Sequence, residues 1–318
     1  MIVACRVFLS LVLFALLLSY GGRAAGGTLL LDLSGENWSI APDPQNAGRG
    51  LEWWKGPTPD AKPARVPGII QTVLPGYHGV AWYWRDFDAP ANPYSQGRWL
   101  LRFGAVDYLA EVWVNGVSVG GHEGGETPFT LDITDAVKPG AANHLAVRVL
   151  NPTAEPIDGI VLAETPHRNK APANITVGGM YNEGGITEPV ELLWCPAVRI
   201  EDVFVRPDWK TGHVRIQATV QNNTEAQAAA SICFAAGPAR SGLVVADTER
   251  QVDLNPGDTI VEADLDVPDH QLWNVDNPYL YRLDTRLSQE TIPAQDLHSV
   301  RFGFRDFRVE KGYFRLNG

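Results

Sequence analysis

The stretch VWVNGVSV, Val112 to Val119, decides the fold class of this chain. On both sides of Asn115-Gly116, apolar residues alternate with other residues at the period of a half-buried β-strand. A type I′ turn needs a positive φ at both of its central residues, and asparagine followed by glycine supplies this at low cost. The stretch therefore predicts a β-hairpin.

The same alternation recurs along the chain and predicts further strands. No stretch after the first 24 residues has a sustained helical period, and 31 glycines and 23 prolines punctuate short segments. The residues predicted to share a strand face are Trp99, Leu101 and Phe103, then Leu145, Val147 and Val149, then Val214, Ile216, Ala218 and Val220, and then Tyr279, Tyr281, Leu283, Thr285 and Leu287. The pattern predicts an all-β protein built from sandwiches or barrels.

The first 24 residues have the features of a secretory signal peptide. Arg6 precedes an apolar run from Val7 to Leu18, and small residues follow up to Ala25. The run is shorter than the roughly 20 apolar residues that span a bilayer, although an uncleaved anchor is the alternative. We expect cleavage near Ala24 and a secreted or periplasmic protein that is not bound to the membrane afterwards.

Composition restricts the partners. The chain has 318 residues, enough for about two domains, and a formal net charge of −11. An acidic protein is a poor ligand for nucleic acid or for an anionic membrane surface, so a neutral glycan is the more suitable partner. Cys195 and Cys233 lie in different predicted domains, and buried thiols are favoured over a disulfide. Neither has the paired spacing of a zinc site, and no metal or cofactor is predicted.

Several stretches, in their order, resemble glycoside hydrolase family 2, the family of β-galactosidases, β-glucuronidases and β-mannosidases. Each is modest alone, but together they cover most of the chain after the signal peptide. The stretches are VAWYWRDFDAP (80–90), LRFGAVDYLAEVWVNGVSVGGHEGGETPFTLDIT (101–134), NHLAVRV (143–149), GGITEPVELLWCP (184–196), VRIEDVFVRPD (198–208), LWNVDNPYLYRL (272–283) and RFGFRDFRVEKGYFRLNG (301–318).

The resemblance implies a jelly-roll sugar-binding domain over residues 27–197 and an immunoglobulin-like β-sandwich over residues 198–299. Residues 300–318 are then a linker into the (β/α)₈ catalytic barrel of the family. A barrel needs about 250 residues, so we expect that the barrel is absent from this sequence and that the chain is truncated.

The function implied is that of a secreted family 2 enzyme of β-galactosidase type in carbohydrate metabolism. Such enzymes hydrolyse terminal β-glycosidic bonds with retention, using two carboxylates about 5 Å apart. In the family both are barrel glutamates, so no catalytic residue is predicted here and the chain alone is expected to be inactive. Glu183, Glu188 and Glu191 are interpreted as surface charges. The alternative is a stand-alone, non-catalytic carbohydrate-binding module, which leaves open whether the chain is part of an enzyme.

One candidate sugar-binding loop precedes the GGI motif. Asn182 matches an asparagine found three residues before the second glycine in the glucuronidase branch of the family, and Tyr181 lies beside it. The aspartate that contacts the sugar in some members is replaced by Gly179. A polar loop that only caps the domain is the alternative. The sequence leaves open which sugar is bound and the oligomeric state.

A second candidate loop carries Tyr77 and His78 in a Pro-Gly turn, where exposure is expected. An aromatic face and polar groups together suit a sugar ring with its hydroxyls. Trp82 and Trp84 follow on one strand face, and packing in the core is the favoured interpretation for both.

Overall fold

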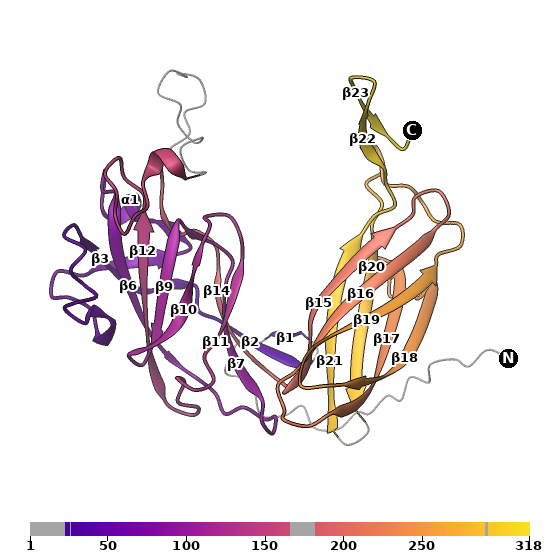
Figure 1. Ribbon diagram of the computed structural model, residues 1–318, viewed down its shortest axis with the longest axis horizontal. Helices are drawn as coiled ribbons and strands as arrows, with labels where there is room; N and C mark the ends of the chain where they lie inside the picture. The colour runs from indigo at the N-terminus through magenta and orange to yellow at the C-terminus, as the bar shows by residue number, and fades with distance from the viewer. Residues whose placement is uncertain (1–22, 26, 166–181, 290–291) are drawn as a thin grey trace.

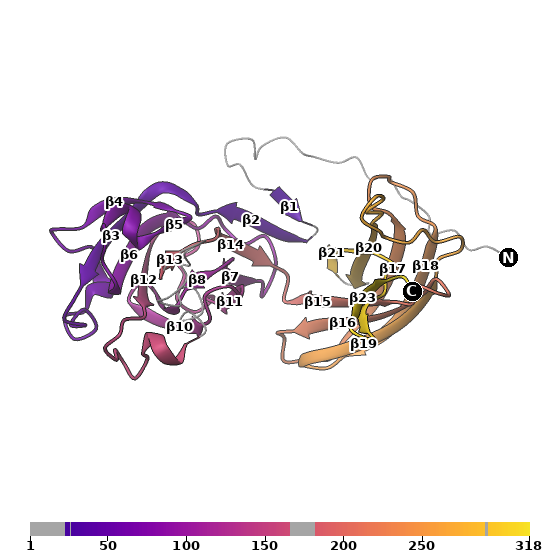
Figure 2. The same ribbon diagram turned by 90° about the horizontal axis from the view of Figure 1, so that it is seen from above.

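The computed structural model describes residues 23–25, 27–165, 182–289 and 292–318. They form two β-sandwiches in succession along the chain, which lie side by side in both ribbon views (Figures 1 and 2). The only α-helix among these residues is the single turn α1 (Ile70–Val73), and η1 (Trp53–Lys55) and η2 (Leu162–Glu164) are 3-10 turns. The predicted all-β class is confirmed.

The first sandwich packs a five-stranded sheet against a six-stranded sheet. The five-stranded sheet has the order β1 (Arg23–Ala25), β2 (Thr28–Asp32), β14 (Val190–Cys195), β7 (Arg98–Phe103) and β11 (Phe129–Asp132). The six-stranded sheet has the order β10 (Val117–Glu123), β9 (Leu109–Val114), β12 (Ala142–Asn151), β6 (Gly79–Asp88), β3 (Gly35–Asp43) and β4 (Lys62–Val66). A small sheet of β5 (Gly68–Ile69), β13 (Gly185–Ile186) and β8 (Val106–Asp107) closes one end.

The predicted hairpin is confirmed as β9 and β10. Val114 pairs with Val117, and Asn115 and Gly116 have φ of 52° and 83°. The Asn115 amide also donates to the Ala136 carbonyl at 2.8 Å. The hairpin is therefore fixed both by its turn and by a contact to a distant loop.

The two central strands of the six-stranded sheet, β6 and β12, are buried on both faces. Their inner residues join the core between the sheets, and their outer residues join a second apolar cluster that includes Trp82, Trp84 and Trp113. The Trp82 and Trp84 rings stack with centroids 6.5 Å apart, and Trp54 from η1 stacks on Trp113 at 5.6 Å. Packing of Trp82 and Trp84 in the core is therefore confirmed, although they fill the outer cluster.

A buried arginine anchors the loops over this outer face. Arg148 of β12 is fully buried and donates to Glu111 at 2.9 Å and to Asp158 at 2.6 Å. Arg49 bonds both of these carboxylates from the solvent side. Burial alone raises the pKa of Asp158, but hydrogen bonds from Arg49 and Asn46 and the nearby arginine charges lower it overall. The network fixes the two loops that carry Arg49 and Asp158 to the sheet.

Replacing Arg148 with methionine should lower the free energy of unfolding of the first sandwich by roughly 3 kcal/mol, because two carboxylates lose their buried partner. Urea unfolding followed by tryptophan fluorescence measures the effect. Arg65→Met is the matched control, because the Arg65–Glu36 pair is exposed and is expected to contribute under about 1 kcal/mol. Equal losses in the two variants would contradict the proposed anchoring role.

Among the described residues, the second sandwich has seven strands in two sheets. One sheet has the order β15 (Val198–Pro207), β16 (His213–Asn222) and β19 (Gly257–Asp266). The other has the order β18 (Ala246–Leu254), β17 (Ala228–Pro238), β20 (Tyr281–Gln289) and β21 (Ile292–Phe302). In β16 the predicted inward residues Val214, Ile216, Ala218 and Val220 are all buried.

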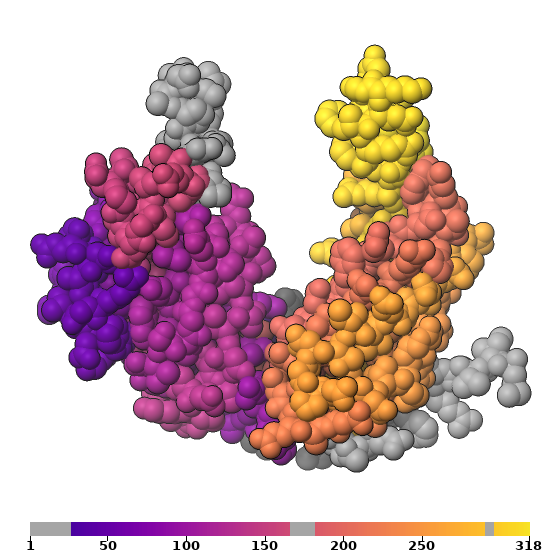
Figure 3. Space-filling view, in the orientation of Figure 1, coloured from indigo at the N-terminus to yellow at the C-terminus, as the bar shows by residue number. Residues whose placement is uncertain are grey.

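The segment after β21 is more ordered than the predicted linker. β22 (Phe307–Glu310) and β23 (Tyr313–Leu316) pair as a hairpin that projects from the sandwich, in yellow in Figure 3. Phe307, Val309 and Phe314 share one face of it and are 63%, 66% and 76% exposed. This face is apolar and uncovered among the described residues.

Candidate functional site

The two candidate loops meet at one end of the first sandwich. His78 precedes β6, and Asn182 lies three residues before β13, 104 positions further along the chain. The His78 Nδ1 and Asn182 Nδ2 atoms are 3.4 Å apart, and both residues contact Asn151. This cluster, which we call the rim cluster, consists of Gln71, His78, Asn151 and Asn182.

Asn151 is the centre of the rim cluster. It is the last residue of β12, is fully buried, and lies opposite Gly79 in the β6–β12 register. Its Oδ1 accepts from Gln71 Nε2 at 3.0 Å and lies 2.9 Å from His78 Nδ1, while its Nδ2 donates to Asn182 Oδ1 at 2.8 Å. A buried amide needs such partners for each polar atom, so Asn151 fixes the three side chains around it.

The His78 ring is the exposed member of the cluster. Because Asn151 Oδ1 can only accept, its 2.9 Å contact places a proton on His78 Nδ1. His78 Nε2 has no partner among the described residues, and as the ring nitrogen without a proton it can accept a hydrogen bond from a hydroxyl group. His78 can therefore bind a polar ligand without disturbing the rest of the cluster.

Asn182 has mainly a structural role. Its Oδ1 accepts from Asn151, and its Nδ2 donates to the Pro152 carbonyl at 2.7 Å. Gln71 similarly donates to the Tyr77 carbonyl at 2.8 Å. These bonds position the loop beside His78 and leave each amide with little free capacity for a ligand.

The GGI motif positions this loop by close packing. A Cβ on Gly184 would lie 2.5 Å from the Asn151 Cβ, and one on Gly185 would lie 2.6 Å from the Gly68 carbonyl oxygen. Gly185 also has a φ of 144°, which side chains rarely adopt. The Gly184 carbonyl accepts from the Ile70 backbone at 2.7 Å, which joins the loop to the start of α1.

Tyr77 differs from the expectation of an exposed ring. It is half-buried against the core between the sheets, and its hydroxyl donates to the Val80 carbonyl at 2.6 Å. Burial raises the pKa of Tyr77 to about 12. Its hydroxyl therefore serves the local fold, whereas Tyr181 and Gly179 lie outside the described residues.

The three glutamates near the GGI motif, Glu183, Glu188 and Glu191, lie at the surface of the first sandwich. Glu183 and Glu188 are exposed, and Glu191 of β14 pairs with Arg102 of β7, 2.5 Å apart. Cys195 is a buried thiol that contacts the Arg98 carbonyl at 3.8 Å, and burial raises its pKa to about 11. In the part of the chain that the structure describes, no group of three or more histidine, cysteine or acidic side chains is arranged to hold a metal, and no helix is long and apolar enough to cross a bilayer.

Comparison with known families identifies the two domains. Residues 66–196 match the sugar binding domain of glycosyl hydrolases family 2, and residues 198–305 match a second model of glycosyl hydrolases family 2. The chain belongs to glycoside hydrolase family 2. The resemblance inferred from its motifs is thus confirmed.

Its relatives include several β-glucuronidases. The β-glucuronidase of Paenibacillus borealis is 28% identical over 314 residues, covering 90% of this chain and 47% of that protein. The β-glucuronidase of Canis lupus familiaris is 30% identical over 312 residues, which cover 88% of this chain and 45% of that protein. The chain spans about half the length of the curated relatives that it matches. Both relatives are β-glucuronidases, whereas the sequence analysis expected a family 2 enzyme of β-galactosidase type.

A solved structure shares the fold. The β-glucuronidase from Ruminococcus gnavus in complex with D-glucaro-d-lactam has a TM-score of 0.72 and 23% identity, covering 93% of this chain and 48% of that one. The match extends over both sandwiches. The likeness lies in the fold of the two sandwiches.

Replacing Gly184 with alanine should force the Asn151 side chain away and lower the free energy of unfolding by about 1–3 kcal/mol. Gly56→Ala is the control, because its φ of 165° is extended and nothing lies within 4 Å of an added Cβ. Urea unfolding and the NMR signal of the His78 ring measure the two effects. An unshifted His78 signal in Gly184→Ala would show that the rim cluster does not depend on this contact.

Proposed function

We propose that this chain is the amino-terminal, non-catalytic part of a secreted or periplasmic family 2 glycoside hydrolase of β-glucuronidase type. It contains the sugar-binding and immunoglobulin-like domains in family order, and its curated relatives are β-glucuronidases. The secreted or periplasmic location rests on the signal-peptide pattern of residues 1–24. The reaction of the whole enzyme is the hydrolysis of a terminal β-glycosidic bond with retention, as inferred from the family resemblance.

The observation that carries this proposal is the rim cluster. It brings together the loop before the GGI motif and the loop before β6, which are the two loops that the sequence identifies as candidates for sugar binding. Hydrogen bonds hold the amides of Asn151 and Asn182, so His78 Nε2 is the group available to a sugar hydroxyl. No carboxylate belongs to the cluster, which suits a contribution to substrate binding rather than to bond cleavage.

The apolar hairpin supports a role as part of a larger enzyme. An isolated two-stranded hairpin is marginally stable in water, and Phe307 and Phe314 stack on its open face with centroids 5.6 Å apart. A further domain that covers this face would remove its apolar surface from water. The matched part covers less than half of the β-glucuronidase relatives, so these proteins are long enough to contain such a further domain.

The purified chain should bind methyl β-D-glucuronide weakly and should not hydrolyse nitrophenyl β-D-glucuronide or β-D-galactoside. Saturation-transfer NMR measures binding, and release of nitrophenol measures turnover. His78→Ala should remove binding at the rim cluster, whereas His298→Ala, in the second sandwich, should leave it unchanged. Hydrolysis that Glu183→Gln abolishes would overturn the assignment of a non-catalytic role.

Replacing Phe307 and Phe314 with serine should reduce self-association of the chain without unfolding either sandwich, because both side chains are largely exposed. Light scattering and the binding of a hydrophobic dye are expected to decrease. Val117→Ser is the control for one exposed apolar residue elsewhere on the chain. If the double variant associates as strongly as the parent, the apolar face of the hairpin does not drive association.

A further inference from the structure

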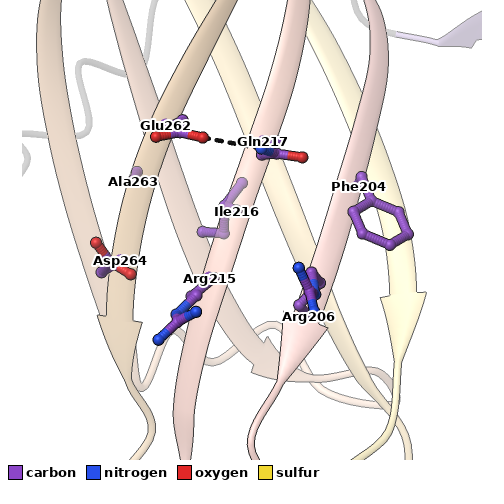
Figure 4. A pocket seen from close by; sticks show the side chains of 8 residues that line it. All are labelled: Phe204, Arg206, Arg215, Ile216, Gln217, Glu262, Ala263 and Asp264. Carbon is purple, nitrogen blue, oxygen red and sulfur yellow. Dashed lines mark hydrogen bonds between the residues drawn. The ribbon is translucent and has the colours of Figure 1, made fainter.

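The outer face of the β15–β16–β19 sheet holds a shallow hollow of about 320 Å³ (Figure 4). Six side chains point outward from the three strands in two rows. Strand pairing aligns Phe204, Gln217 and Glu262 in one row and Arg206, Arg215 and Asp264 in the next. Neighbouring strands are about 4.8 Å apart, so the two rows form one continuous surface.

The two arginines of this surface form no ion pair among the described residues, although Asp264 of β19 lies opposite Arg215. Arg206 and Arg215 lie directly opposite each other on β15 and β16, and both are exposed. Neither forms an ion pair or a hydrogen bond with any residue that the structure describes. Like charges directly opposite each other destabilise a sheet, and an anion placed between them would remove this repulsion. The planar guanidinium groups also suit a carboxylate, which can accept two parallel hydrogen bonds.

The two acids of the surface, in contrast, already have partners. Glu262 accepts from the Gln217 amide at 2.8 Å, and Asp264 lies 3.1 Å from His213 Nε2. A carboxylate has about four acceptor positions, so both acids can still accept from ligand hydroxyls. They also repel a bare anion, which makes an acidic ligand without hydroxyl groups a poor fit.

An exposed aromatic ring completes the set of groups. Phe204 is 55% exposed and lies beside Arg206 along β15. An exposed ring of this kind offers an apolar surface to the C–H face of a sugar. The hollow therefore combines a platform for a ring, donors for a carboxylate and acceptors for hydroxyls.

We propose that this face is a second saccharide-binding site, specific for a sugar that carries a carboxylate, that is, a uronic acid residue. Arg206 and Arg215 hold the carboxylate, Phe204 packs against the ring, and Glu262 and Asp264 accept from its hydroxyls. A neutral sugar leaves the two arginines without an anion. An acidic peptide provides the anion but meets Glu262 and Asp264 with no hydroxyl groups to offer them.

Isothermal titration of the full chain with tri-galacturonate tests the proposal, with maltotriose as the neutral probe and tri-glutamate as the acidic peptide. Tri-galacturonate should bind most tightly, and added salt should weaken its binding. Arg206→Ser/Arg215→Ser should weaken binding at least about tenfold, as should Phe204→Ala. Arg240→Ser/Arg301→Ser is the matched control, because it removes the same charge from two exposed arginines of the same sandwich that also lack ion pairs. Thermal melting confirms that each variant is folded.

The outcomes separate this site from the rim cluster. His78→Ala should retain tri-galacturonate binding at the second sandwich, whatever its effect on methyl β-D-glucuronide. Equal losses in the two double arginine variants, or equal affinity for tri-glutamate, would mean general attraction of anions and would overturn the proposal. Unchanged binding in Arg206→Ser/Arg215→Ser would overturn it as well.

Discussion

The buried amide of Asn151 is the constraint on which the candidate site depends. It ends β12, so the longest pairing of the first sandwich, β6 with β12, brings it opposite Gly79 and next to His78. Water cannot reach it, and its polar atoms must be satisfied by protein groups. Gln71, His78 and Asn182 supply them from three separate segments. The fold and the site are thus coupled through one side chain, and the close approach of Gly184 is the steric condition for it.

Strand β12 also shows why the six-stranded sheet of the first sandwich has apolar residues on both of its faces. Strand β12 carries Val147 and Val149 toward the core between the sheets and Ala146 and Leu150 toward the tryptophan cluster. Between these last two, Arg148 also faces outward, where Glu111 and Asp158 neutralise its charge. An arginine can be buried at this position because its donors form a fork that two carboxylates and an amide can accept from. The loops over the outer face are therefore held by tryptophan packing and by one ionic network together.

Local patterns in the sequence predicted local structure well. Asn115-Gly116 predicted its hairpin because the turn depends on two residues only, and the alternation in β16 predicted its inward face because that strand has one solvated side. Alternation gave no indication that β6 and β12 are covered on both faces, because the covering residues, Trp53 and Trp54, lie far away in sequence. Tyr77 was expected to be exposed from its turn, but its hydroxyl reaches the carbonyl of Val80, only three residues away.

The candidate site could be predicted only in part, because its residues also come from segments that lie far apart in the sequence. The sequence pointed to His78 and Asn182 separately, each in its own loop. The two residues are 104 positions apart, and they meet at Asn151 only because the pairing of β6 with β12 places Asn151 opposite Gly79. Nothing in the motif around Asn151 marks it, since a single polar residue at the end of a strand is common. One signal was available: Gly184 and Gly185 are adjacent glycines before a strand, which indicates a close approach of backbone or side chain.

A buried carboxylate, Asp296, contributes contacts at the junction between the two sandwiches. Asp296 of β21 accepts from the Ile200 backbone at 2.7 Å and from the Thr28 hydroxyl at 3.2 Å. Burial raises its pKa, and these hydrogen bonds act in the opposite direction by favouring the charged form. Because Thr28 belongs to β2 of the first sandwich and Ile200 to β15 of the second, the carboxylate joins the two domains. Any separation of the sandwiches at this point would remove the Thr28 bond from a group that is already costly to bury, so the contact favours their remaining together.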